Sequence, residues 1–291
     1  LKTSGINYVI AQDTDSMYLN LHPLVVKTFG DRKPSIIERV DFLDKITSVK
    51  DGGPISRMID KNYEALREYT NAYEQKMIMK REAIATRGVW TGKKRYAMAV
   101  WDQEGVRYDK PHIKIVGLES VRSTTPKLAK KAIEDAIAII LDDHQDVNRL
   151  RRFIKQFRSD FEQANINDIA YASGVQGLGK YADSANIYKD GTPQHVRAAL
   201  LFNHLIKTRG LDKEYPTIKS GAKIKYVPLL EPNPIHHDII AWEDEFPKFL
   251  DLSDYIDYNA LFNRTFLSPV EAIMEANGWK LVETINLEDF L

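Results

Sequence analysis

The sequence predicts an α+β protein in which antiparallel β-hairpins and flanking helices come first and a mostly α-helical part follows. Apolar residues alternate in some early segments and recur at helical spacing in others, whereas helical spacing dominates after Ser123. Of the 291 residues, 43% are apolar, which is enough to bury a core. Cysteine is absent, which excludes disulfides and Cys-based metal sites and suits a reducing compartment.

The first elements are a β-hairpin and two helices. Residues 7–12 and 16–21 alternate and are rich in Tyr, Ile, Val and Leu, with only Asp13-Thr14-Asp15 between them, which predicts a hairpin. Residues 34–49 and 55–73 then carry apolar residues at helical spacing. One face of the second helix contains Met58, Leu66, Tyr69 and Tyr73. Strand patterns return at 77–79, 95–101 and 112–116, separated by the turn signals Thr91-Gly92 and Glu104-Gly105.

Helices are predicted to fill the second part, because capping signals precede several apolar stripes. Thr125 and Pro126 open a helix whose inward face is Leu128, Ala132, Ile133, Ala136, Ile137 and Ile140. Asp146 opens another, with Val147, Leu150, Phe153, Phe157 and Phe161 inward. Thr192-Pro193 begins a third that ends near Gly210, and Ser268-Pro269 with Glu271 predicts a capping box for a last helix that ends near Gly278. The change of character at 117–124 divides the chain into residues 1–120 and 121–291.

Charge is distributed unevenly, although the formal net charge is zero. Residues 1–230 hold 38 basic and 28 acidic residues, a balance of +10, while residues 231–291 hold 3 and 13, a balance of −10. A basic body with an acidic tail indicates a polyanionic partner for the body, and an ordinary solvated surface is the alternative.

Two further features bear on the class of protein. No run of about eighteen apolar residues occurs, so no membrane span is predicted. The chain starts at Leu1 rather than Met and enters a strand pattern soon afterwards, so we expect it to be part of a longer protein.

The predicted hairpin tip places two carboxylates, Asp13 and Asp15, at a solvent-reachable turn. Mg²⁺ takes oxygen ligands and typically binds only one or two protein carboxylates, leaving its other positions for water and phosphates. The alternative is that aspartates favour turns by bonding to local backbone N–H groups. The longer run Asp13-Thr14-Asp15-Ser16-x-Tyr18 between two apolar strands is more specific than Asp-x-Asp alone.

That run resembles the third conserved polymerase motif of the family B DNA polymerases. Lys93-Lys94-Arg95-Tyr96 is similar to the basic-aromatic motif with which this family grips primer-template duplex. The stretches Gly117-Leu118-Glu119 and Ser123-Thr124-Thr125-Pro126-Lys127 resemble the palm-to-thumb junction of the T4-like bacteriophage type. The resemblance spans essentially the whole chain and implies a C-terminal part of the palm over 1–120 and a thumb with an acidic tail over 121–291.

The resemblance implies a role for each carboxylate. Asp15 would bind both catalytic Mg²⁺ ions, Asp13 would be its less critical neighbour, and Glu82 would be an acidic residue nearby, although a strand Glu paired with a Lys is the alternative. Gln12 departs from the family, which usually has Gly there. The other metal-bridging Asp and the nucleotide-binding helix lie upstream in the family, so this chain would supply only part of the two-metal site and would not polymerise alone.

The resemblance also implies binding surfaces. Lys93, Lys94, Arg95, Tyr96 and Lys127 would contact duplex DNA, assisted by basic residues of the predicted helices at Lys130, Lys131, Arg149, Arg151, Arg152, Lys155, Arg158, Lys180 and Lys189. Many of these residues are equally expected on solvated helix faces. Leu287, Phe290 and Leu291 would dock on a sliding clamp, the alternative being a terminus folded back on the protein. His236-His237 lacks a third ligand nearby, so no zinc site is predicted.

The implied function is that of a C-terminal fragment of a replicative DNA-directed DNA polymerase. Its partners would be primer-template DNA, dNTP, the upstream polymerase portion with exonuclease, fingers and the rest of the palm, and a sliding clamp, in the cytoplasm of an infected bacterium. The alternative function is that of a non-catalytic module that binds DNA and also tethers to the sliding clamp. A nucleotide-sugar transferase that uses Asp-x-Asp gains no support from the Lys-Lys-Arg-Tyr run or the helical second part.

Overall fold

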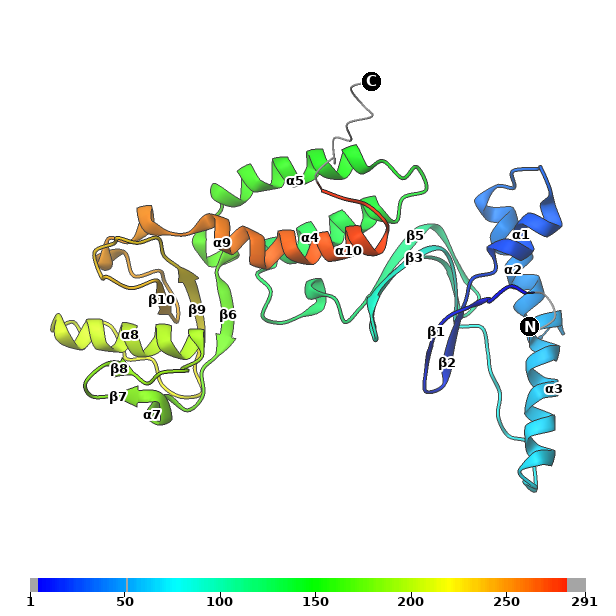
Figure 1. The fold of residues 1–291 in the computed structure, drawn as a ribbon, viewed down its shortest axis with the longest axis horizontal. Helices are drawn as coiled ribbons and strands as arrows, with labels where there is room; N and C mark the ends of the chain where they lie inside the picture. The colour runs from blue at the N-terminus through cyan, green and yellow to red at the C-terminus, as the bar shows by residue number, and fades with distance from the viewer. Residues whose placement is uncertain (1–4, 51, 282–291) are drawn as a thin grey trace. The chain divides into compact units, whose positions relative to one another are not determined.

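The computed structural model describes residues 5–50 and 52–281 and confirms the α+β class (Figure 1). The chain forms two compact units, Leu1–Ile115 and Val116–Leu291. The division after Ile115 lies close to the change in sequence character at Gly117. None of the described helices is both long and apolar enough to cross a membrane.

Unit 1 begins with the predicted hairpin, formed by β1 (Val9–Asp13) and β2 (Ser16–Leu19) in antiparallel pairing. Three helices follow: α1 (His22–Phe29), α2 (Ile36–Thr47) and α3 (Pro54–Tyr69). Ser35 and Glu38 form a capping box that fixes the start of α2. Sequence analysis missed α1, because this eight-residue helix contains Val25, Val26 and Thr28, whose β-branched side chains favour strands.

The remaining elements of unit 1 form a three-stranded sheet of β3 (Ala83–Gly92), β4 (Arg95–Gln103) and β5 (Val106–Val116). β3 and β4 are antiparallel, and Gly92 pairs with Arg95 across a two-residue turn. The strand predicted at 77–79 is wrong, since this segment is irregular and none of the described strands pairs with it. Met77 and Ile78 are exposed.

Unit 2 contains the predicted long helices α4 (Lys127–Ile140), α5 (Val147–Glu162) and α8 (Gln194–Thr208). The inward face of α4 is buried as predicted, except that Leu128 is half-buried. Asp146 caps α5 by accepting a hydrogen bond from the backbone N–H of Arg149. An aromatic cluster closes the core between α5 and the C-terminal helices, and it consists of Phe157, Phe161, Phe262 and Phe266.

Sequence analysis missed a second antiparallel sheet, which lies in unit 2 and has the order β10 (Ile239–Trp242), β9 (Lys223–Pro228), β6 (Tyr171–Gly174). All four residues of β10 are buried, so this strand shows no alternation. The short elements are η1 (Glu119–Val121), α6 (Ile166–Ile169), α7 (Leu178–Tyr181), β7 (Ala182–Asp183), β8 (Ile187–Tyr188), η2 (Lys248–Leu250) and η3 (Ser253–Tyr255).

The capping box predicted at Ser268 is also wrong, because the helix begins ten residues earlier. The Asp257 side chain accepts a hydrogen bond from the Ala260 N–H and starts α9 (Tyr258–Phe262). A π-helical turn, η4 (Asn263–Leu267), connects α9 directly to α10 (Ser268–Ala276). The wide turn ends two residues before Pro269, which cannot donate a backbone hydrogen bond of a regular α-helix.

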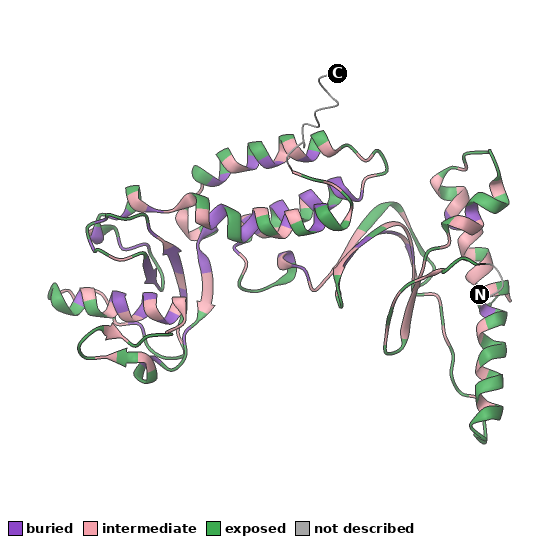
Figure 2. Ribbon diagram, viewed as in Figure 1, coloured by how far each residue is buried: buried purple, intermediate pink, exposed green. Residues whose placement is uncertain are grey.

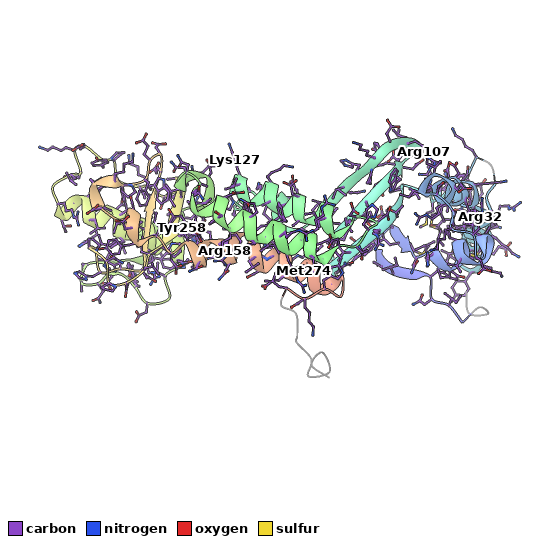
Figure 3. The ribbon with its side chains drawn as sticks, turned by 90° about the horizontal axis from the view of Figure 1, so that it is seen from above. Arg32, Arg107, Lys127, Arg158, Tyr258 and Met274 are labelled. Carbon is purple, nitrogen blue, oxygen red and sulfur yellow. The ribbon has the colours of Figure 1, made fainter. Side chains whose placement is uncertain are left out.

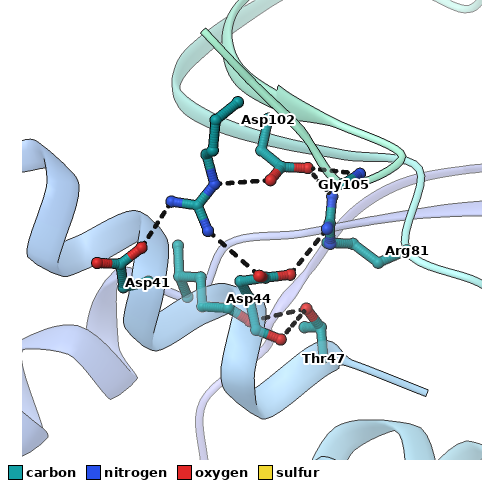
Figure 4. Close-up of polar contacts among 8 residues, drawn as sticks. Asp41, Asp44, Thr47, Arg81, Asp102 and Gly105 are labelled. Carbon is teal, nitrogen blue, oxygen red and sulfur yellow. Dashed lines mark hydrogen bonds and ion pairs between the residues drawn. The ribbon is translucent and has the colours of Figure 1, made fainter. Parts of the chain in front are cut away.

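A buried carboxylate organises the polar interior of unit 1 (Figure 4). Asp102, on β4, is 1% exposed. It accepts hydrogen bonds from Arg81, from the Arg107 Nε at 2.7 Å and from the Gly105 N–H at 3.0 Å. Burial alone would raise the pKa of Asp102, but these hydrogen bonds and the cationic guanidinium of Arg81 outweigh burial and lower the pKa from its ordinary value.

The two arginines also connect this carboxylate to α2. Arg81 Nη2 lies 2.7 Å from an oxygen of Asp44, and Arg107 contacts Asp41 at 2.7 Å and Asp44 at 3.2 Å. Each guanidinium therefore bridges the sheet and the helix, with the fork geometry that suits carboxylates.

We predict that Asp102→Asn destabilises unit 1 by about 3 kcal/mol, because two guanidinium groups lose their buried counter-charge. Native-state hydrogen exchange of the β4 amides measures this loss. The matched control is Asp135→Asn, which removes an exposed pair with Lys131 and should change stability by less than about 0.5 kcal/mol. Since the folded-state pKa is lowered, the stabilisation from Asp102 should be present above the ordinary value of 3.8 and be lost as pH falls below it. Equal losses of stability in Asp102→Asn and Asp135→Asn would contradict the role of Asp102 as the buried counter-charge.

Candidate metal and nucleic-acid site

The tip of the first hairpin is a tight turn that carries two carboxylates. Asp13 pairs with Ser16, and Thr14 adopts a left-handed φ of 39°. The Ser16 hydroxyl donates to the Asp13 carbonyl at 3.1 Å, and the Thr14 hydroxyl donates to the Asp13 carboxylate at 3.3 Å. Asp15 is exposed. The turn therefore holds Asp13 by local hydrogen bonds and presents Asp15 to solvent.

Gln12 fits this turn without strain. It lies within β1, pairs with Met17 and is exposed, while the left-handed conformation falls on Thr14. The backbone of this hairpin therefore does not require glycine at position 12.

An aromatic cluster joins this hairpin to the sheet of unit 1. The ring centroid of Tyr18, on β2, lies 5.6 Å from that of Trp90 and 5.3 Å from that of Tyr96, in edge-to-face geometry. Trp90 and Tyr96 stack on neighbouring strands with centroids 5.8 Å apart. A Cβ at Gly88 would lie 2.7 Å from the Trp90 ring, so only glycine leaves room for this ring. Gly88 and Trp90 were not predicted from the sequence, although a glycine inside a strand is a signal of close packing.

The cluster also contains a hydrogen bond between tyrosines. The Tyr18 hydroxyl donates to the Tyr96 hydroxyl at 2.8 Å. Burial, this hydrogen bond and the nearby charges of Glu82 and Asp13 raise the pKa of Tyr96 far above its ordinary value. Tyr96 is consequently neutral under all physiological conditions.

The basic-aromatic motif lies at the turn between β3 and β4. Lys93 and Lys94 are the two turn residues, both exposed, and Lys94 has a left-handed φ of 58°. The Lys94 ammonium lies 3.4 Å from the Asp13 carboxylate. The structure thus brings together two motifs that are about eighty residues apart in the sequence.

Glu82 lies just before β3 and forms an ion pair with Lys114 on β5. Its side chain is 56% exposed. This arrangement is the one expected of a surface glutamate paired across a sheet. A role for Glu82 near a metal stays a prediction.

The carboxylates at the hairpin tip match the donor set of a hard cation. Within residues 5–50 and 52–281, no cluster of three or more His, Asp or Glu side chains could hold a metal ion. Asp13 and Asp15 therefore offer at most two protein ligands, which is the number that Mg²⁺ commonly takes. Among these described residues, His236 and His237 belong to no group of three or more side chains that could hold a metal ion.

Unit 2 carries the other predicted DNA-binding residues. Lys127 is the first residue of α4 and is exposed (Figure 3). Several basic residues form contacts within the unit, among them Lys131 with Asp135, Arg149 with Asp142, Arg152 with Asp146, and Arg158 with Asn259. Arg158 also lies 4.5 Å from the centroid of the Phe262 ring. Leu287, Phe290 and Leu291 lie outside the described residues.

Comparison with known proteins gives matches along nearly all of the chain. The sequence model of DNA polymerase family B matches residues 55–276. The DNA-directed DNA polymerase of Escherichia phage RB69 is 34% identical over 286 residues, which cover 94% of this chain and 31% of the relative. The DNA-directed DNA polymerase of Enterobacteria phage T4 is 32% identical over 302 residues, covering 99% of this chain and 32% of the relative. The chain therefore spans about a third of the length of these curated relatives.

We predict that the hydroxyl pair in the aromatic cluster is energetically coupled. Tyr18→Phe and Tyr96→Phe should each destabilise unit 1, and the double variant should cost about 1 kcal/mol less than their sum, because each single change leaves the other hydroxyl without its partner. Hydrogen exchange of the β3 and β4 amides measures the three variants. Tyr69→Phe is the control, since Tyr69 is 89% exposed and should show no effect. Additive losses in the double variant would mean that the hydroxyls do not interact.

Proposed function

The chain belongs to DNA polymerase family B, and from this premise we propose that it supplies the C-terminal part of the palm and the thumb of a template-directed DNA polymerase. Unit 1 corresponds to the palm portion and unit 2 to the thumb. The reaction of the assembled polymerase is transfer of deoxynucleotides from dNTP to a primer 3′-end. The T4 relative supports extending this role to the β1–β2 hairpin, because that match covers 99% of the chain.

One observation carries the proposal. The turn with Asp13 and Asp15 and the turn with Lys93 and Lys94 come from distant segments and meet with Asp13 and Lys94 3.4 Å apart. A carboxylate turn recruits cations, and a lysine turn recruits phosphates. Both chemistries are needed where a primer end meets a nucleotide.

The proposed cofactor is Mg²⁺, held by Asp15 and assisted by Asp13. Such an ion stabilises the attacking and leaving oxygens in phosphoryl transfer. The chain's own residues position this site. The turn hydrogen bonds of Thr14 and Ser16 fix Asp13, and the aromatic cluster of Tyr18, Trp90 and Tyr96 fixes the hairpin on the sheet. Lys94 offsets the charge of Asp13 and leaves Asp15 free for a cation.

Duplex DNA is the proposed ligand of the basic surface. Lys93, Lys94 and Arg95 lie at or beside an exposed turn, where ammonium and guanidinium groups attract phosphates without regard to sequence. Tyr96 is buried in the aromatic cluster, so its proposed role is to position the turn. Lys127, an exposed residue of unit 2, is proposed as a further phosphate contact.

The other partners are proposed from the family. They are the upstream polymerase portion and a sliding clamp, with Leu287, Phe290 and Leu291 as clamp anchors, in the cytoplasm of the infected bacterium. The −10 balance of residues 231–291 favours a tail that avoids DNA and meets a protein. The alternative function is a non-catalytic module that binds DNA and tethers the polymerase to the clamp. These binding activities would not depend on Asp15.

The catalytic assignment is tested in an assembled polymerase, in which this chain is fused to the part of the RB69 polymerase outside the matched stretch. Asp15→Asn should lower the primer-extension rate by at least about a hundredfold, because losing a metal ligand costs several kcal/mol of transition-state stabilisation. Asp13→Asn should have a smaller effect. Asp212→Asn, at an exposed turn in unit 2, should leave the rate unchanged. An Asp15→Asn enzyme within a few-fold of the parent would favour the non-catalytic alternative.

The DNA surface is tested with the chain itself and a primer-template duplex. Affinity should fall steeply with salt, and Lys93→Ala/Lys94→Ala should lower the log-log slope by about 1.8, because each phosphate contact contributes about 0.9. Fluorescence anisotropy at several salt concentrations measures both quantities. The control, Lys33→Ala/Lys61→Ala, removes two exposed lysines from other parts of unit 1. Equal slopes for the two variants would exclude the β3–β4 turn as the contact.

A further inference from the structure

Unit 1 leaves much of its apolar surface uncovered. Of the fourteen large hydrophobic side chains that are exposed among the described residues, twelve lie in unit 1. In the described part of the longer unit 2, only Val121 and Leu230 belong to this set. Large apolar areas on a soluble protein mark surfaces that another protein covers.

The clearest case is α3, whose apolar residues form one stripe. They recur at intervals of three, four and seven, and the stripe consists of Ile55, Met58, Ile59, Leu66 and Tyr69. The opposite face carries Arg57, Asp60, Lys61, Glu64 and Glu68. Such a pattern is typical of a helix that buries one face against a protein core.

Three of the five stripe residues are nevertheless exposed, whereas Ile55 and Ile59 are half-buried. The residue of α3 that is buried is Ser56, and Figure 2 shows the helix as exposed along most of its length. Met58 is 43% exposed, Leu66 44% and Tyr69 89%. Beyond the helix, Tyr73 is fully exposed and Ile78 is 70% exposed, so the uncovered surface continues past the end of α3.

We propose that the stripe is a docking surface for the rest of a family B polymerase, an inference that rests on the proposed function. The two curated relatives carry about two-thirds of their length outside the stretch matched by this chain, so a large polypeptide is available to cover it. The lysine and arginine residues of α3 (Arg57, Lys61 and Arg67) lie outside the stripe, so the apolar face itself offers no cation to a phosphate. Its apolar character is that of a core interface.

The test uses single cysteines, because the chain contains none. Met58→Cys and Leu66→Cys report on the stripe, and Lys61→Cys and Glu68→Cys report on the opposite face of the same helix. Each variant is prepared as the chain alone and as the fusion to the RB69 portion, and alkylation by N-ethylmaleimide is followed by peptide mass spectrometry. All four positions should react alike in the chain alone. In the fusion the two stripe positions should react at least about tenfold more slowly, because alkylation then requires local opening.

Two results would overturn the proposal. The first is that, in the fusion, the stripe cysteines react as fast as the cysteines on the opposite face. The second is that the stripe cysteines are protected in the chain alone and more so at higher concentration, which would assign the surface to a second copy of the chain. Alkylation does not depend on catalysis. A fusion that protects the stripe but extends no primer would therefore count against the proposed function and not against the docking surface.

A second measurement compares Leu66→Gln with Glu64→Gln. In the chain alone neither change should alter the melting temperature, because both side chains are already exposed. In the fusion, Leu66→Gln should lower it by several degrees, whereas Glu64→Gln should not. An unchanged melting temperature for the Leu66→Gln fusion would also overturn the proposal. A fusion to the T4 relative provides an independent assembly for the same variants.

Discussion

The arrangement of unit 1 depends on a carboxylate that is buried in its central strand. Asp102 is the one charged side chain among the described residues that is fully buried, and a charge in that position is costly unless it is paired. Arg81 and Arg107 meet this requirement and each reaches α2 as well. The helix itself buries only Val40. The directions of the two guanidinium groups consequently set the position of α2 on the sheet more than apolar packing does. Paired charges of this kind specify one geometry and add little net stability.

The candidate site depends on the strand that this network anchors. β4 carries Tyr96 near its start and Asp102 near its end, and residues 97–100 between them are buried. Tyr96 and Trp90 present a rigid aromatic surface, and Tyr18 brings the first hairpin onto it. The carboxylate turn therefore rests on a fixed support, which is what a catalytic group needs to hold its geometry.

Local signals in the sequence were sufficient for some elements and insufficient for others. The first hairpin, α2, α4, α5 and α8 follow from alternation, apolar spacing and caps, all of which act within a few residues. The pairing of Asp13 with Lys94, and the packing of Tyr18 on Trp90, join segments about seventy to eighty residues apart, so spacing along the chain cannot reveal them. The prediction at Ser268 failed because a cap at Asp257 started the helix first, and a π-helical turn connects that helix directly to α10, which contains Pro269. The buried strand β10 was missed because a short, fully apolar run looks the same in a strand and in a helix.

The two units stabilise themselves by different means, and this difference explains where apolar surface remains. Unit 2 gathers four phenylalanines and the apolar faces of its helices into one closed core. Unit 1 uses charges to hold α2 and aromatic rings to hold its hairpin, so the apolar stripe of α3 is not consumed by either arrangement. Met58, Leu66 and Tyr69 of this stripe remain exposed in unit 1, so their burial can stabilise contact with another part of a protein. The unit that carries the carboxylate turn is thus the unit that keeps most of the exposed large apolar side chains among the described residues.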